Sequence, residues 1–365
     1  MNSRLRRLRK FLDEEKLDAI FISSLPNIIY LTNFSDFTTF ERDGFVLITK
    51  KNQYIFTHGI YKEAVETQVK NFILIDIKRE NPINKSVKNI IEKENIQSLG
   101  FESFDLKVDE YERLTKEIDK KILKTTHLIS KLRIQKTTEE IKTIKKACLL
   151  GDKAFKFIIT KLKPGISELD LAAEFEYFVK SHGATLSFDS IVAFGSHASK
   201  PHHVPTNTKL KINQFVLFDC GIKLNNYCSD MTRTVFFGNA TKNQKKAYQT
   251  VLIAQQKAIQ QCNNFIFKHM DVPAKELDRI AREYLTSQNF PDMPHSLGHG
   301  IGLEVHEAPR LTPLSQEKLA SGNVFSIEPG IYIPGKFGIR IEDLFAIENG
   351  KLFQLTKAPS KFMQV

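Results

Sequence analysis

Residues 218–221 read Phe-Asp-Cys-Gly and residues 227–234 read Tyr-Cys-Ser-Asp-Met-Thr-Arg-Thr, and these two segments decide how the carboxyl-terminal part of the chain folds. The apolar runs around them, 215–221 and 227–237, are typical of β-strands. Each strand carries one aspartate, Asp219 or Asp230. A carboxylate in a buried strand is costly unless its charge is compensated. The two segments therefore predict a hairpin that is built around a cation.

The register of this hairpin follows from its turn. If Leu224 and Asn225 form a two-residue turn, cross-strand partners have residue numbers that add to 449. Asp219 and Asp230 would then face each other directly, with Cβ atoms about 5 Å apart. Like charges at facing positions repel, and a cation between them reverses the sign of that interaction.

A second acidic hairpin is predicted further along the chain, in the segments Ile-Glu-Pro-Gly-Ile-Tyr at 327–332 and Arg-Ile-Glu-Asp at 340–343. Glu328 and Glu342 have numbers that add to 670, so they would face each other across a turn centred on Gly335. Arg340 lies two residues before Glu342 and shares its face of the strand.

A solvated strand edge is the simplest explanation for one acidic residue in a strand. It does not explain two facing acidic pairs together with His299, which lies in the glycine-rich run His-Ser-Leu-Gly-His-Gly-Ile-Gly at 295–302. Four carboxylates and one imidazole in apolar surroundings indicate a pair of metal ions.

The acidic hairpins are preceded by similar segments. Glu168-Leu169-Asp170 opens one amphipathic stretch, and Glu276-Leu277-Asp278 opens another 108 residues later. The acidic strand positions repeat at nearly the same distance, 109 and 112 residues. This period is too long for a solenoid repeat and predicts a duplicated half-domain with a pseudo-twofold axis. A site between the halves would receive two carboxylates from each.

With these motifs the chain resembles M24-type metallopeptidases of the pita-bread fold, in the branch of the Xaa-Pro dipeptidases (prolidases) and aminopeptidase P. The resemblance extends from about Ile129 to the carboxyl terminus. The segment Asn-Ile-Ile-Tyr-Leu-Thr-Asn-Phe at 27–34 resembles the creatinase-type amino-terminal domain. The expected fold class is therefore α/β (α+β): a creatinase-like α/β domain at 1–126, then a pita-bread catalytic domain with internal pseudo-twofold duplication at 127–365.

The resemblance implies two divalent metal ions. Asp219 would bind one ion, His299 and Glu328 the other, and Asp230 and Glu342 would bridge both. A carboxylate-rich, nitrogen-poor site suits manganese, with cobalt, iron or zinc as alternatives. Two metal ions that share carboxylates activate water for peptide hydrolysis, so no covalent nucleophile is expected.

The resemblance also implies roles for other pocket side chains. His202 matches an active-site histidine, and His306 matches one that stabilises the tetrahedral intermediate. His295 would line the substrate pocket, and Glu328 is expected to shuttle a proton as well as bind metal. His203 has no counterpart in the family pattern.

Two arginines bear on the length of the substrate. Arg310 matches the position where prolidases hold the substrate carboxylate, and Arg340 matches a second basic residue beside the metals. A guanidinium binds a carboxylate in a bidentate manner. The expected activity is hydrolysis of Xaa-Pro dipeptides. An aminopeptidase P that acts on longer peptides remains an alternative, with Arg310 then a surface residue, and a metal-free binding module is a further one.

Composition fits a soluble enzyme. The 365 residues carry a net charge of +11, but the lysines are dispersed and no RNP-like run occurs, so nucleic acid is not an expected partner. No apolar run reaches the roughly 20 residues that span a membrane, and the amino terminus lacks the pattern of a signal peptide. Four cysteines without a CxxC pair indicate buried thiols in a reducing cytoplasm. The family resemblance suggests a homodimer.

Local patterns predict several elements. Leu5, Leu8, Phe11 and Leu12 at helical spacing predict an amphipathic amino-terminal helix. Strands are expected at 19–22, 45–49, 54–57 and 72–77. Thr137 and Glu140 predict a capping box, and Gly183 predicts the end of a helix.

Overall fold

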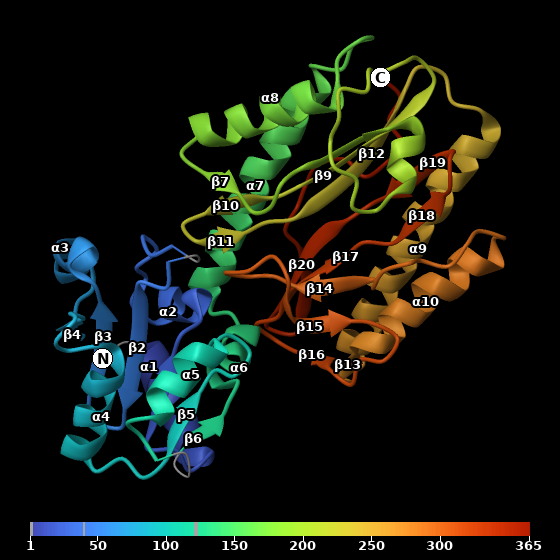
Figure 1. Cartoon of the computed structure of the whole chain (residues 1–365). Helices are drawn as coiled ribbons and strands as arrows, with labels where there is room; N and C mark the ends of the chain where they lie inside the picture. The colour runs from blue at the N-terminus through green and yellow to red at the C-terminus, as the bar shows by residue number, and fades with distance from the viewer. Residues whose placement is uncertain (1–2, 39–40, 120–122) are drawn as a thin grey trace. The chain divides into compact units, whose positions relative to one another are not determined.

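A computed structural model describes residues 3–38, 41–119 and 123–365, and Figure 1 shows their helices and strands. The chain divides into two compact units after Arg133. The sequence places this division earlier, after residue 126. The difference is helix α6 (Leu128–Ile134), which contacts the amino-terminal unit through the bond from Arg133 Nη1 to Asn27 Oδ1, at 2.8 Å.

The amino-terminal unit is built on one mixed sheet of six strands in the order β4-β3-β2-β1-β5-β6. Antiparallel pairs join β1 to β2 and β2 to β3, while β4, β5 and β6 pair in parallel with their neighbours. The elements are α1 (Ser3–Glu14), β1 (Ala19–Ile22), α2 (Leu25–Thr32), β2 (Gly44–Thr49), β3 (Gln53–Thr57), α3 (Gly59–Gln68), β4 (Ile73–Asp76), α4 (Ile83–Glu94), β5 (Leu99–Phe101), α5 (Val108–Thr115) and β6 (Leu123–Thr125).

The predicted elements of this unit are confirmed. The amphipathic amino-terminal helix is α1, which buries Leu5, Leu8 and Leu12. The four expected strands correspond to β1, β2, β3 and β4, with ends that differ by one residue at most. Every residue of β1 and β2 is buried, which explains why both read as continuous apolar runs.

The carboxyl-terminal unit contains two long helix pairs and several antiparallel sheets. Its elements are α7 (Thr138–Ile159), α8 (Glu168–Ser181), β7 (Thr185–Leu186), β8 (Ile191–Phe194), η2 (Gly195–Ser199), β9 (Gln214–Cys220), β10 (Ile222–Leu224), β11 (Tyr227–Cys228), β12 (Met231–Phe237), α9 (Lys242–Phe267), β13 (Val272–Pro273), α10 (Ala274–Ser287), β14 (Gly298–Gly300), β15 (Glu307–Leu311), β16 (Lys318–Leu319), β17 (Val324–Ile327), β18 (Gly330–Ile333), β19 (Phe337–Arg340), β20 (Asp343–Glu348) and β21 (Lys351–Gln354).

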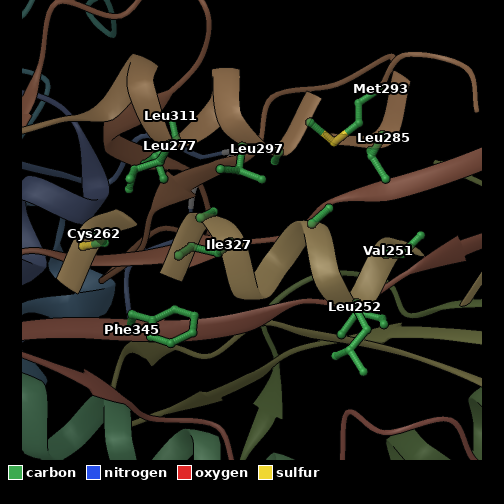
Figure 2. Close-up of a cluster of buried hydrophobic side chains, with 14 of the residues drawn as sticks. Val251, Leu252, Cys262, Leu277, Leu285, Met293, Leu297, Leu311, Ile327 and Phe345 are labelled. Carbon is green, nitrogen blue, oxygen red and sulfur yellow. The ribbon is translucent and has the colours of Figure 1, made fainter. Parts of the chain in front are cut away.

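Two hydrophobic cores in this unit correspond to the two predicted halves. The first packs α7 and α8 against β8, β9 and β12. The second packs α9 and α10 against strands that include β17 and β20. Figure 2 shows the second core, to which Val251, Leu252 and Cys262 of α9 contribute together with Ile327 and Phe345. Helix pair and acidic hairpin therefore recur, as the spacing of the sequence motifs predicts.

The helix ends follow the local sequence. Thr137 and Glu140 form the predicted capping box at the start of α7, and Ser167 and Asp170 form another at α8. Gly183 has a φ of +72° just after α8, a conformation that favours glycine and ends the helix. In the described part of the chain, no helix is both long enough and apolar enough to cross a bilayer.

The second acidic hairpin has the register that the sequence predicts. The residue numbers of cross-strand partners add to 670 between β18 and β19, and again between β17 and β20. Glu328 and Glu342 occupy the gap between these two ladders, at positions that continue the same register. Gly335 lies in the turn with a φ of +69°. The ladder is interrupted where the Glu342 N–H donates to the Thr232 carbonyl of the first hairpin instead, at 3.1 Å.

The first hairpin has a different register from the predicted one. Asp219 lies opposite Thr232, and partners along β9 and β12 add to 451 instead of 449. The turn consists of Asn225 and Asn226, with φ values of 48° and 70°, and lies one residue later than predicted. The expectation that Asp219 and Asp230 face each other directly is therefore wrong. Both carboxylates nevertheless line one cavity of this unit.

The expected strand at 227–237 is divided into β11 and β12. At the division, the Ile222 N–H donates to Ser229 Oγ (3.0 Å) and the Ser229 N–H to the Ile222 carbonyl (2.8 Å). Asp230 follows directly and lies outside both strands. Because of this break, Asp230 is not part of the β9–β12 ladder to which Asp219 belongs.

Candidate metal centre

A cavity of about 480 Å³ in the carboxyl-terminal unit brings together all the site residues that the sequence singles out. Apolar side chains, among them Phe188, Ile191, Val204 and Val305, complete its wall. The predicted site residues that line it are Asp219, Asp230, Glu328, Glu342, His202, His295, His299, His306, Arg310 and Arg340.

The five expected metal ligands lie at the floor of this cavity. Ligand atoms of Asp230, His299 and Glu342 are all within 4.8 Å of one another, and all three side chains are buried. His299 Nε2 is 3.3 Å from Glu328 Oε1 and 3.7 Å from Asp230 Oδ2. The first hairpin thus supplies two carboxylates and the second hairpin two more, and His299 comes from β14 between them in sequence.

Several carboxylate oxygens at this floor have no protein partner. Asp219 Oδ1, Asp230 Oδ1 and Glu342 Oε1 are buried, and no group in the described part of the chain donates a hydrogen bond to them. Buried acceptors without a donor are costly, so a native site with three of them needs an explanation. Hard, multiply charged cations bind such oxygens directly, so this donor set fits divalent metal ions.

The pKa shifts of the carboxylates at the cavity floor also indicate divalent metal ions. Burial raises the pKa of Asp230 and of Glu342 well above the usual carboxyl range, and neighbouring carboxylates raise it further. Burial also opposes ionisation of Glu328, but the hydrogen bond and charge of His299 lower its pKa to about 2. Glu328 is therefore paired with His299, while Asp230 and Glu342 lack positive charge that a metal ion would supply.

Arg340 connects the floor to the pocket wall. Its guanidinium donates to Asp219 Oδ2 (2.5 Å), to Thr232 Oγ1 (3.0 Å) and to the Tyr332 hydroxyl (2.7 Å). Thr232 Oγ1 in turn donates to Glu342 Oε2 at 2.8 Å. The carboxylates that share this network are held in fixed orientations before any metal binds.

Tyr332 and Thr232 are site residues that the sequence reasoning missed. Tyr332 links Arg340 to His295, whose Nε2 is 2.9 Å from the Tyr332 hydroxyl. The signal was present in the register of the second hairpin. Gly330 is the partner of Arg340, and Tyr332 lies two residues further on the same face.

Three predicted residues project into the cavity without taking part in this floor network. His306 has a ring centroid 4.3 Å from that of His299, and burial and the charge of His299 lower its pKa to about 4. Arg310 is the cross-strand partner of His299 between β14 and β15, so both side chains lie on the same face. His202 lies on the segment that follows η2.

Comparison with known proteins identifies the family. The pattern of metallopeptidase family M24 matches residues 142–349, and the creatinase/prolidase amino-terminal domain matches residues 4–135. The chain belongs to metallopeptidase family M24. It is an M24 peptidase with a creatinase-type amino-terminal domain and a pita-bread catalytic domain, the fold class that the sequence predicts.

Relatives match this M24 chain over nearly its whole length. A Xaa-Pro dipeptidase of Pyrococcus horikoshii is 35% identical over 360 residues, which cover 98% of this chain and 97% of the relative. The structure of a Xaa-Pro dipeptidase from Bacillus anthracis has a TM-score of 0.89 at 34% identity, with 99% of each chain covered. An X-Pro aminopeptidase from Thermotoga maritima has a TM-score of 0.85 at 28% identity, covering 96% of this chain and 98% of that one.

Proposed function

We propose that this M24 peptidase is a Xaa-Pro dipeptidase that holds two divalent metal ions on Asp219, Asp230, His299, Glu328 and Glu342. The observation that carries the proposal is the cavity floor, where buried carboxylate oxygens of three of these residues have no donor among the described residues. The named dipeptidases that match the chain end to end support the choice of substrate class.

In this proposal Asp219 would hold one ion, His299 and Glu328 would hold the other, and Asp230 and Glu342 would be shared by both. When bound, the metal pair supplies Lewis acidity and an activated water. Glu328 accepts the proton of the attacking water and passes it to the leaving amine. Ser326 Oγ donates to Glu328 Oε1 at 3.1 Å and fixes the orientation of that carboxylate.

The pocket side chains then act on the peptide. His306, with its lowered pKa, is a neutral imidazole at pH 7 and donates one N–H to the developing oxyanion. His202 contacts the substrate from another wall, and His295, held by Tyr332, lines the pocket. Arg310 binds the carboxylate of the dipeptide, and Arg340 orients Asp219.

Aminopeptidase P activity is the second candidate, because an X-Pro aminopeptidase has nearly the same fold as this chain. The dipeptidase reading is preferred because Arg310 lies opposite His299, where it can hold a carboxylate close to the metal ions. An enzyme that prefers longer peptides would leave Arg310 without that role.

The proposal extends to metal, assembly and location. Manganese is proposed as the native metal because the ligand set is rich in carboxylates, with cobalt, iron or zinc as alternatives. A homodimer is proposed, to be tested by light scattering of the purified protein. A cytoplasmic location is supported by the four free, buried cysteines. A nucleic-acid partner is not proposed.

One activity panel tests this function. Metal-stripped protein is reloaded with Mn²⁺, Co²⁺, Fe²⁺ or Zn²⁺ and assayed on Ala-Pro, Leu-Pro and matched Xaa-Pro-Yaa tripeptides. A dipeptidase shows the higher kcat/KM on the dipeptides. A preference for the tripeptides assigns the chain to the aminopeptidase branch, and no metal-dependent hydrolysis of either class refutes the proposal.

A further inference from the structure

A second cluster of potential ligand side chains lies beside the metal centre, and one of its members, His203, also lines the cavity. Glu168, His197 and His203 place one ligand atom each within 4.8 Å of one another. The Glu168 side chain is completely buried, and it belongs to the first residue of α8. The proposed catalytic reaction uses none of these three residues.

The carboxylate of Glu168 accepts hydrogen bonds from one continuous segment of the chain. It accepts hydrogen bonds from the Phe194 N–H (2.9 Å) and from His197 Nδ1 (2.9 Å) on one oxygen. The other oxygen accepts from His203 Nε2 (2.9 Å), from the Thr206 N–H (3.0 Å) and from Thr206 Oγ1 (2.8 Å). All five donors lie between residues 194 and 206, so a single buried anion ties down both ends of this segment.

His202 lies within this segment and has no such anchor of its own. It is exposed at the cavity wall, and no group in the described residues forms a hydrogen bond or ion pair with its side chain. His306 lines the same cavity. The position of the His202 ring therefore depends on its backbone. That backbone is held by the adjacent residue, because the His203 side chain is hydrogen-bonded to Glu168.

We propose that the Glu168–His203 hydrogen bond is a positioning device that holds His202 against the substrate. Glu168 and His203 are positioning residues, and His202 is the group that touches the peptide. This inference rests on the proposed peptidase function. We call the Glu168–His203 hydrogen bond in this role the brace. A misplacement of about 1 Å at a reacting centre costs up to about 100-fold in rate, so loss of the brace should have a measurable effect.

A metal ion is the competing explanation for the cluster. A glutamate and two histidines form a ligand set that zinc accepts, and two ligands of one ion also lie about 3 Å apart. The brace is favoured because five donors already satisfy the carboxylate. A cation would displace the protons that both imidazoles donate to it. This difference makes metal content a decisive measurement.

The first test uses two variants of His203. Gln can donate from a position close to that of imidazole Nε2, whereas Leu cannot donate. We expect His203→Gln to retain kcat for Ala-Pro within about threefold and His203→Leu to lose about 10- to 100-fold, mostly in kcat. Asp152→Asn is the matched control, because Asp152 is a buried carboxylate that accepts from Lys357 N and Ala358 N instead of from the His202 segment.

A double-mutant cycle separates positioning from general destabilisation. If Glu168 and His203 act through His202, then His203→Leu adds little further loss in a His202→Ala background. Losses that multiply in the double variant overturn the inference, as does a control that loses as much kcat as His203→Leu. Bound zinc in excess of the catalytic ions, lost specifically in His203→Leu, overturns it in favour of a metal site.

The inference remains testable if the proposed function fails. Absence of Xaa-Pro hydrolysis in the wild-type protein refutes the function alone. Histidine-ring ¹H–¹³C spectra, with His202 assigned by His202→Ala, then report the position of this ring. We expect its resonance to move in His203→Leu and to stay in His203→Gln. An unchanged His202 resonance in His203→Leu refutes the brace.

Discussion

Lys136 Nζ lies 2.5 Å from Glu307 Oε1, in an ion pair whose side chains are only 2% and 9% exposed. Lys136 directly precedes the capping box of α7, and Glu307 directly follows His306 at the start of β15. The pair therefore joins the beginning of the catalytic unit to β15, the strand that carries Arg310 and directly follows His306. Charges this deeply buried depend on each other for solvation.

Breaking this pair should be costly. Lys136→Met removes the positive charge beside the buried Glu307 carboxylate, and we expect a loss of about 3–5 kcal/mol in the free energy of unfolding. Urea denaturation of the metal-free protein measures it. Lys142→Met is the matched control, since its pair with Glu139 is exposed (61% and 81%) and should contribute little to stability. Equal losses in the two variants would contradict the role of burial.

Asp230→Asn tests the bridging role at the metal centre. An amide keeps the shape of the side chain but supplies no charge to two cations. We expect bound metal, measured by elemental analysis after dialysis, to fall below that of the wild type, and turnover of Ala-Pro to be lost. Asp152→Asn should keep both. A variant that still binds two ions and turns over at a near-normal rate would show that Asp230 is not a bridge.

Substrate choice gives a third prediction. The enzyme should hydrolyse Ala-Pro and Leu-Pro far faster than Ala-Ala, because the pocket beyond the metal ions must accept the pyrrolidine ring of proline. Initial rates at equal concentration, with the same metal loading, make the comparison. Similar rates for Ala-Pro and Ala-Ala would indicate a general aminopeptidase.

Arg310→Ala separates the two proline-specific activities. A charge-assisted contact with the dipeptide carboxylate contributes about 1.5–3 kcal/mol, which is about 10- to 100-fold in kcat/KM. The lower kcat/KM should result mainly from a higher KM, and it should be seen only with dipeptide substrates. Amidation of the dipeptide should weaken it as a substrate of the wild type and change little in the variant. A wild-type enzyme that is indifferent to amidation would remove Arg310 from the substrate site.

Acid should weaken the contribution of Glu168 to stability. Burial opposes its ionisation, but the hydrogen bonds from His203, Phe194 and Thr206 lower its pKa below the ordinary value of 4.5. A carboxyl with a lowered folded-state pKa stabilises the protein above its unfolded pKa, and this stability is lost as the pH falls through the folded pKa. The difference in unfolding free energy between wild type and Glu168→Gln should therefore shrink from pH 6 towards pH 3. A constant difference would show that ionisation of Glu168 contributes nothing.

The sequence by itself predicted the register of the second hairpin and the set of charged and histidine side chains that line one cavity. Gly335 centres a turn between two regular strands, so the numbers of Glu328 and Glu342 were sufficient to establish their register. The duplicated helix and hairpin motifs likewise predicted two half-domains. These features depend on residue type and on contacts within a short stretch of chain.

The tertiary structure decided what depends on contacts between distant segments. The first hairpin differs from the prediction because its turn is Asn225-Asn226, both at positive φ, and not Leu224-Asn225. Arg340 and Asp219 are 121 residues apart, and Glu168 and His203 are 35 apart. No strand or helix period predicts such pairs, because they form only when packed elements bring a buried charge to the one partner that can solvate it.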